Sequence, residues 1–411
     1  MRVFSPRFWR GKEEDFVEKI KNVWIPCQAR NDRKGMFAVK ILQLIYESLG
    51  SPFGFGGAGV RAYEIYKRLK DRHDITLLCL KYPNARDGDI EGLKHIFVGT
   101  ESKSLTKSVL AYTIQAARFV RRYGNDFDII VENFLPSTPF FSRFFTKKPV
   151  ILQVQGIMGG HSLRKFNPFY SIPMFLAERF YPGLYDRFIF VSDITKEKVM
   201  SRIKRKCNIC PVIPNGINKE LLSVTLEDGD NILFLSRIDI YTKGLDLLIN
   251  AFEKICPEFP DLRLILAGYE FDSFNKLVSG RPASIKEKIK YAGFVTGDEK
   301  IGLLSGAKIF ILPSRHESSP ISILEAAACG KPVIVSDIPE LRFVHKEGFG
   351  LSFPSGSVVG LTEKMKILLS DNKKREAMGR RGREFSSKFL WDDIAKQFED
   401  VLKAHSRSHD H

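Results

Sequence analysis

The 411-residue sequence predicts an α/β fold made of two doubly wound, Rossmann-like domains. Three observations predict this fold. Short apolar segments that suit buried parallel strands alternate with segments that suit helices. The same alternation starts again after Asn215, inside the segment VIPNGI. The composition, 44% hydrophobic and 27% charged, is that of a globular chain long enough for two domains with full cores.

The first domain is predicted to span residues 36–215, after an N-terminal extension over residues 1–35. Met36, where the first strand is expected to begin, is an alternative start of the protein. A glycine loop, an amphipathic helix and a second strand are predicted within residues 54–80. Further strands are expected in the segments DFDIIVEN (126–133), KPVILQVQG (148–156) and DRFIFVSD (186–193).

The second domain is predicted to span residues 216–390. Its strands are expected in the segments DNILFLSR (230–237), LRLILAG (262–268), AKIFILPS (307–314) and KPVIVSD (331–337), with helices between them. The final amphipathic helix, residues 391–405, is expected to cross back to the first domain, and residues 406–411 are expected to form a frayed tail.

The charge is divided unevenly between the two halves. Residues 1–215 contain 36 Lys and Arg against 20 Asp and Glu, whereas the rest of the chain contains 28 of each. A basic first half indicates an anionic partner, such as phospholipid head groups, a lipid phosphate or an acidic glycan. Two segments, 108–124 and 140–149, mix apolar and basic residues as a membrane-surface segment would. Nucleic acid is not expected, because the chain shows no recognised binding motif.

The sequence also indicates the cellular compartment of the protein. No apolar run reaches the ~18 residues of a membrane span, and no basic-then-apolar leader begins at Met1, so we expect a cytoplasmic protein that attaches at most to the surface of the membrane. Six cysteines are scattered along the chain. The segment KCNIC (206–210) contains a CxxC pair, but no second pair completes a zinc site, and free thiols are expected.

The segment HESSPISILEAAACGKPVIVSD (316–337) places two glutamates, Glu317 and Glu325, in a predicted strand-loop-helix-strand unit. In an ordinary structural helix Ser319 would be the N-cap, Pro320 the first helical residue and Gly330 the stop. The helix is almost entirely apolar, however, so the carboxylate of Glu325 needs hydrogen-bond donors.

Such a unit forms a ligand crevice where the strand ends and the helix begins. The amides around Ser319 and Ile321 would face an anion, and the two carboxylates would accept hydrogen bonds from sugar hydroxyls. The residues alone therefore indicate a nucleotide-sugar site, with a purely structural helix as the alternative.

Other motifs are weaker. Gly54, Gly56 and Gly59 spell GxGxxG, but the next strand ends in LLCLKYP without the acid that a nicotinamide or flavin dinucleotide site requires. The two Asp-Gly-Asp segments, 87–89 and 228–230, imitate a metal-binding DxD motif but suit ordinary turns. Arg237 and Lys243 follow a predicted strand, where they would form a diphosphate clamp or remain solvated loop charges.

Several segments together resemble glycosyltransferase family 4, the retaining enzymes of the GT-B fold. The resemblance runs from about Met36 to the last helix. It rests on a combination of segments in the order and spacing of that family, which are VIPNGI (212–217), SRIDIYTKGLDLLI (236–249), LILAG (264–268), YAGFV (291–295), EKIGLLSGAKIFILPS (299–314) and the E-x7-E pair Glu317 and Glu325.

The resemblance implies that the second domain binds a nucleoside diphosphate sugar, without a metal or another cofactor. Glu325 would bind the ribose hydroxyls and Glu317 the transferred sugar, while Arg237 and Lys243 would neutralise the diphosphate. The remaining contacts that the family implies come from Ser319, Ile321 and Ser322 at the phosphates, Phe294 at the base, and Gly56 and Gly57 closing on the donor from the first domain.

The chain departs from the family pattern at one position. Many relatives carry a histidine after the strand where this chain has Gln155, and His161 follows six residues later. An amide cannot accept a proton at neutral pH. Either His161 takes part in catalysis, or Gln155 only positions a substrate and the departing phosphate accepts the proton of the acceptor.

The sequence therefore predicts a metal-independent, retaining glycosyltransferase acting on a hydroxyl of a glycan or lipid-linked acceptor. A non-catalytic nucleotide-sugar-binding protein that docks on a membrane surface or a partner through its basic half is the alternative. An NAD-dependent sugar-nucleotide enzyme is disfavoured by the missing ribose acid.

Overall fold

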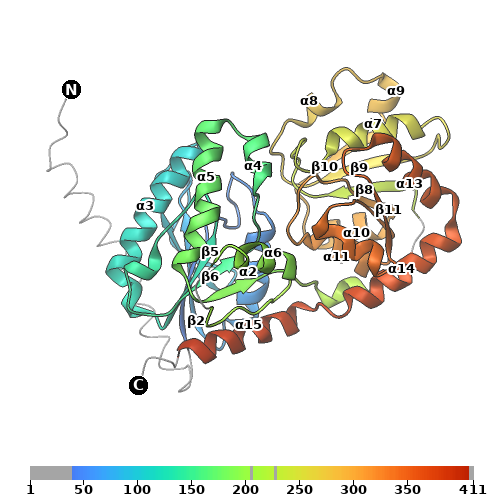
Figure 1. The fold of residues 1–411 in the computed structure, drawn as a ribbon. Helices are drawn as coiled ribbons and strands as arrows, with labels where there is room; N and C mark the ends of the chain where they lie inside the picture. The colour runs from blue at the N-terminus through green and yellow to red at the C-terminus, as the bar shows by residue number, and fades with distance from the viewer. Residues whose placement is uncertain (1–38, 204–206, 226–228, 407–411) are drawn as a thin grey trace, which may run out of the picture.

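The computed structural model describes residues 39–203, 207–225 and 229–406 as two α/β domains, each built around one sheet (Figure 1). The predicted extension, residues 1–35, lies outside the described residues. The first sheet has the strand order β3-β4-β2-β1-β5-β6-β7, and only β3 is antiparallel to its neighbour. Its strands are β1 (Lys40–Leu44), β2 (Asp74–Leu80), β3 (Gly88–Ile90), β4 (Leu93–Val98), β5 (Ile129–Phe134), β6 (Val150–Val154) and β7 (Phe188–Phe190).

Alternate residues of the first sheet enter two different cores. Leu42 of β1 packs with α3 on one face, and its neighbour Ile41 packs with α2 on the other. Because both faces are covered, the strands are nearly continuous apolar runs. The helices of this domain are α2 (Gly57–Leu69), α3 (Leu105–Tyr123), α4 (Gly160–Lys165), α5 (Pro168–Phe180) and α6 (Asp193–Met200).

The second sheet is parallel throughout, with the strand order β10-β9-β8-β11-β12-β13. Its strands are β8 (Asn231–Leu235), β9 (Arg263–Ala267), β10 (Ile289–Gly293), β11 (Ala307–Leu312), β12 (Val333–Ser336) and β13 (Gly350–Phe353). The helices around it are α7 (Leu245–Ile255), α8 (Phe274–Val278), α9 (Ala283–Lys286), α10 (Gly297–Ser305), α11 (Ile321–Ala328), α12 (Arg342–Lys346), α13 (Val358–Ser370) and α14 (Asn372–Ser386). The predicted fold class is confirmed.

Helix α15 (Trp391–Ser406) leaves the second domain and packs on the first (Figure 1). Trp391 and Phe398 are buried in the same core as α2. At the crossing, Ile217 pairs with Leu390 and accepts a hydrogen bond of 3.0 Å from the amide of Trp391. The two chain passages between the domains therefore lie side by side.

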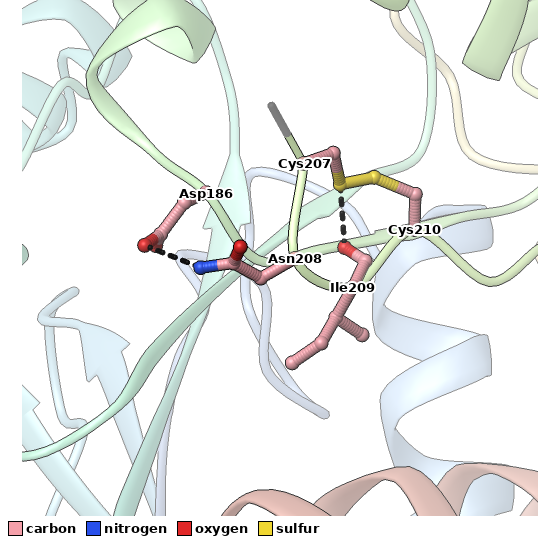
Figure 2. The surroundings of a disulfide bond; sticks show 5 residues. All are labelled: Asp186, Cys207, Asn208, Ile209 and Cys210. Atoms are coloured by element: carbon pink, nitrogen blue, oxygen red, sulfur yellow. Dashed lines mark hydrogen bonds between the residues drawn. A yellow bond between two sulfur atoms is a disulfide. The ribbon is translucent and has the colours of Figure 1, made fainter. Parts of the chain in front are cut away.

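The expectation of free thiols is wrong for Cys207 and Cys210, which form a disulfide (Figure 2). The turn between them lies beside β7, where the amide of Phe188 donates a 2.8 Å hydrogen bond to the carbonyl of Ile209. This tight turn brings the two Cα atoms to 6.4 Å, within the range that a disulfide spans. The thiols of Cys79, Cys256 and Cys329 are free and buried. None of the described helices combines the length and the apolar composition that a membrane span requires.

Candidate active site

The candidate site lies where loops from both domains meet beyond the carboxyl ends of their parallel strands. Gly156 and Ser318 lie close together across the two domains, because a Cβ added to Gly156 would lie 1.9 Å from Ser318 Oγ. Only a glycine allows this contact. The loops that surround the site follow β1, β6, β8 and β11 and comprise residues 45–56, 155–159, 236–244 and 313–320.

Glu317 lies in the loop after β11, and its carboxylate accepts hydrogen bonds from two side chains. Its Oε1 accepts hydrogen bonds of 2.7 Å from Lys243 Nζ and of 2.7 Å from Ser314 Oγ. The glutamate is 6% exposed and the lysine is mostly buried. Glu317 and the predicted phosphate-binding Lys243, 74 residues apart, thus form one buried charge pair.

Glu325 receives its donor from a residue that sequence reasoning did not select. Lys300 Nζ, on α10, lies 2.6 Å from Glu325 Oε1. The need for a donor was predicted from the apolar surroundings of Glu325, and Lys300 lies in the segment EKIGLLSG that supported the family resemblance. Nothing in the sequence indicated which basic residue would supply it.

Helix α11 begins one residue later than predicted. Pro320 is the N-cap, the helix starts at Ile321, and no side chain caps its first turn, so the prediction that Ser319 is the N-cap is wrong. The reason is that Pro320 has an extended ψ of 115°, which places it before the helix. The carbonyl of Ser319 instead accepts a 2.8 Å hydrogen bond from Asn215 Nδ2 of the interdomain linker. Ser322 also lies in the first turn, whose amides therefore remain available to an anion.

Arg237 and Asp239 form a second charged group in the loop after β8. Arg237 Nη2 lies 3.1 Å from Asp239 Oδ2, and its guanidinium lies 5.0 Å from the ring centre of Phe271. Lys165 of α4, in the first domain, also pairs with Asp239. Burial raises the pKa of Asp239, but the hydrogen bond from Lys165 and the charge of Arg237 outweigh this and hold the pKa below its usual value. Asp239 and Lys165 therefore connect the two domains at the site.

His161 reaches across to the second domain from the start of α4. Its ring stacks on His316 at 5.0 Å and on Tyr241 at 5.5 Å between ring centres. Its Nε2 lies 3.3 Å from Thr242 Oγ1. Gln155 stays with its own domain and donates a 2.8 Å hydrogen bond to Asn133 Oδ1. The imidazole thus lies at the domain interface, while the amide is fixed beside β5.

Acid is expected to weaken the His161–His316 stack. Burial, and then the neighbouring His161, lower the pKa of His316 from 6.5 to about 4, although Glu317 and Glu340 oppose this. Burial and the charge of Lys165 also lower the pKa of His161. Between about pH 4 and pH 6.5 the unfolded chain therefore binds more protons than the folded protein. The contribution of the neutral imidazoles to the free energy of unfolding is complete above pH 6.5 and is lost as the pH falls towards about 4.

Replacing His316 by Phe keeps an aromatic ring but removes the titrating group. The melting temperature of the wild-type protein should fall more steeply than that of His316→Phe as the pH is lowered from about 7 to about 5, by a few degrees. Differential scanning calorimetry at several pH values tests this. Parallel pH dependences would show that the imidazole contributes nothing to the acid sensitivity.

The glycine loop is supported by Glu47, which sequence reasoning missed. Its Oε2 accepts hydrogen bonds of 2.9 Å from the amide of Gly56 and 2.6 Å from that of Gly59. Burial raises the pKa of Glu47 against the lowering effect of these bonds. The amide of Gly56 is therefore already occupied, whereas Gly57 faces α11, where an added Cβ would lie 4.0 Å from Ile321 Cδ1.

Glu47→Ala is expected to lower kcat by about tenfold while changing the affinity for free nucleoside diphosphate little, because it loosens a loop of the first domain. Glu47→Gln keeps an acceptor and should recover most of the rate. Steady-state kinetics and nucleotide titration of both variants test this. An equal loss of kcat in the two variants would contradict the proposal that Glu47 acts by accepting hydrogen bonds from the glycine loop.

Phe294 lies further from these groups. It follows β10, which is separated from β11 by two strands, and its side chain is about half exposed.

Among the described residues, no group of three or more His, Cys, Asp or Glu side chains is arranged to hold a metal ion. Asp87 and Asp89 instead accept hydrogen bonds of 2.7 Å and 2.6 Å from backbone amides.

Comparison with known proteins identifies the family of both halves of the chain. Residues 55–221 match the family model described as Glycosyltransferase Family 4, and residues 223–385 match that described as Glycosyl transferases group 1. An uncharacterized glycosyltransferase of Methanocaldococcus jannaschii is 25% identical over 356 residues, which cover 86% of this chain and 95% of the relative. The phosphatidyl-myo-inositol mannosyltransferase of Mycobacterium leprae is 29% identical over 193 residues, covering 45% of this chain and 51% of the relative.

Solved structures share the fold. Sucrose-phosphate synthase of Thermosynechococcus elongatus superposes with a TM-score of 0.72 at 19% identity, covering 89% of this chain and 98% of that structure. The Anabaena protein HepE in complex with UDP and glucose superposes with a TM-score of 0.69 at 18% identity, covering 89% of this chain and 100% of that structure.

Proposed function

Because the chain belongs to glycosyltransferase family 4 and has the GT-B fold, we propose that it is a retaining, metal-independent enzyme that transfers a sugar from a nucleoside diphosphate sugar. The acceptor is a hydroxyl of a glycan or of a lipid-linked molecule. The observation that carries this proposal is the pair of buried ion pairs, Glu317 with Lys243 and Glu325 with Lys300, on either side of the uncapped start of α11.

The two pairs suit the two ends of such a donor. Lys243 and Arg237 supply positive charge for the diphosphate, and the amides of Ile321 and Ser322 add donors at the phosphates. The carboxylates of Glu317 and Glu325 accept hydrogen bonds from the sugar and the ribose. The two lysines orient the carboxylates before the donor arrives, so the site is preorganised.

In the proposed reaction the acceptor oxygen bonds to the anomeric carbon as the bond from that carbon to the diphosphate oxygen breaks. Both events take place on the same face of the sugar, which retains its configuration. The acceptor proton passes to an oxygen of the departing diphosphate, because Gln155 cannot accept it and the ring of His161 is already stacked on His316 and Tyr241. In this scheme Lys243 and Arg237 stabilise the charge that develops on the leaving group.

The basic first half suits an anionic acceptor or the anionic cytoplasmic face of a membrane. Two relatives, by their names, act on lipid substrates: the phosphatidyl-myo-inositol mannosyltransferase of Mycobacterium leprae and a Campylobacter jejuni transferase that adds N-acetylgalactosamine to an undecaprenol-linked sugar. We therefore place the protein in the cytoplasm, at the membrane surface.

Release of nucleoside diphosphate from a panel of UDP-, GDP- and ADP-sugars tests this function, with membrane lipid extract as the acceptor source. We expect turnover with at least one donor, unchanged when EDTA removes divalent metal ions, and a product with the anomeric configuration of the donor. Loss of activity with EDTA that added metal restores would contradict the metal-independent mechanism. Donor binding without turnover would favour the alternative, a non-catalytic nucleotide-sugar-binding protein.

A further inference from the structure

Helix α5 buries two polar residues and exposes most of its large apolar ones. Its only buried side chains are those of Ser171 and Glu178. A helix that packs on a soluble core shows the opposite pattern. The exposed apolar side chains include Phe169, at 78%, and Phe180, at 64%, and this set, which we call the α5 surface, consists of Phe169, Tyr170, Ile172, Leu176 and Phe180.

Polar contacts attach α5 to the domain and leave this surface free. Glu178 accepts hydrogen bonds of 2.7 Å from the amide of Met158 and of 2.7 Å from that of Gly159. Asn167 caps the first turn, where its Oδ1 accepts a 2.9 Å hydrogen bond from the amide of Phe169. Because the helix is held by its one carboxylate, its large apolar side chains are not needed to anchor it to the sheet.

The α5 surface continues beyond the end of the helix. Tyr181, the next residue, accepts a 2.8 Å hydrogen bond from the amide of Phe141, and the two rings lie 5.1 Å apart. Phe141 and Phe144 are themselves exposed. The predicted membrane segment 140–149 thus adjoins the end of α5. An apolar patch of this extent on a soluble protein marks a site of interaction.

The exposed charged side chains of the segment that contains α5 are all basic. Between residues 157 and 180 the single acidic side chain is that of Glu178, which is buried, whereas Arg164 and Arg179 are exposed. Exposed arginines beside apolar side chains suit phosphate groups at the edge of hydrocarbon. A second copy of this chain would bring these arginines together without acidic partners on the same surface, which is unfavourable.

We propose that the α5 surface docks the protein on a lipid bilayer that contains anionic phospholipid. The aromatic and aliphatic side chains enter the interfacial layer, and Arg164 and Arg179 contact lipid phosphates. This identifies a different element from the predicted segment 108–124, most of which forms α3.

Docking through α5 also positions the interdomain site relative to the membrane. This part of the inference rests on the proposed lipid-linked acceptor. Helix α4 lies between α5 and the second domain in Figure 1, and its residues His161 and Lys165 contact Thr242 and Asp239 there. Docking through α5 therefore brings the interdomain site to the membrane surface, where the hydroxyl of a lipid-linked acceptor is presented.

Sedimentation of the full-length protein with vesicles tests the proposal. We expect binding to vesicles of phosphatidylcholine mixed with phosphatidylglycerol and much weaker binding to phosphatidylcholine alone. The triple variant Ile172→Ser, Leu176→Ser, Phe180→Ser should lose at least about tenfold in partition to the mixed vesicles. The matched control replaces three exposed apolar residues of α3, as Leu105→Ser, Leu110→Ser, Ile114→Ser, and should bind like the wild type.

Two further measurements keep the result unambiguous. Phe169→Trp, which preserves the apolar surface, should show blue-shifted emission with mixed vesicles. Nucleotide-sugar binding without vesicles should be the same in the wild type and the α5 variant, so that a failure of docking is distinguished from a failure of the proposed enzyme. The proposal is overturned if the wild type does not sediment with mixed vesicles, or if both triple variants lose the same amount of partition to them. It is also overturned if the wild type is a dimer that the α5 variant converts to a monomer.

Discussion

Lys243→Ala is expected to lower kcat/KM by about a thousandfold, the largest effect of any single substitution at the site. Lys243 is the buried partner of Glu317, at 2.7 Å, and lies beside the proposed diphosphate position. In the proposed mechanism, its removal takes away the cation that stabilises the leaving group. It also leaves the carboxylate of Glu317 in a buried position with only Ser314 Oγ as a polar donor, which costs about 3 kcal/mol or more of folding free energy.

Steady-state kinetics and thermal unfolding of this variant separate the two effects. Lys243→Arg keeps a positive charge and should recover part of the rate. Lys254→Ala, on the exposed side of α7, changes the net charge equally and should behave like the wild type. A Lys243→Ala enzyme that retains more than about a tenth of wild-type kcat/KM would contradict the proposed role in leaving-group stabilisation.

Glu317 and Glu325 are expected to separate by role, which is the second large effect. Glu325→Ala should weaken the binding of free nucleoside diphosphate by about 10- to 100-fold, because it removes charge-assisted hydrogen bonds to the ribose. Glu317→Ala should lower kcat by a similar or larger factor and leave nucleotide affinity nearly unchanged, because in the proposed site Glu317 binds the sugar that is transferred.

Calorimetric titration of nucleoside diphosphate against both variants, beside kcat measurements, tests the separation. Glu317→Gln and Glu325→Gln serve as controls of equal size, because they remove the charge but not the volume. Equal loss of nucleotide affinity in the two alanine variants would contradict the assignment.

Much of the fold was predictable because both sheets are covered on both faces. The strands β1, β6, β8, β11 and β12 are mostly apolar runs, and the sequence signal is correspondingly clear. The strands that were missed are short or lie towards the edges of the sheets. In β3 and β13 the exposed and half-buried positions break the apolar run. Only two residues separate β3 from β4, so the two strands cannot be told apart in the sequence.

The site was predictable where strand ends determine it and not where side chains pair across long separations. Glu317, Lys243 and Arg237 all follow parallel strands, and such loops meet at one edge of a sheet. The partners of these residues depend on packing that the sequence does not display. Lys300 reaches Glu325 from another helix, and Lys165 reaches Asp239 from the other domain.

The central claim, that the region around α11 binds a nucleoside diphosphate sugar, is tested most directly by thermal unfolding of the wild type and Lys243→Ala with a panel of UDP-, GDP- and ADP-sugars. At a ligand concentration of roughly 100 times Kd, the matching donor should stabilise the wild type by about 2.7 kcal/mol, a rise of several degrees in melting temperature. We expect at least one donor to produce this rise in the wild type and a much smaller one in Lys243→Ala. If no member of the panel shifts the wild type, or the same donor shifts both proteins equally, the donor site is not where we place it.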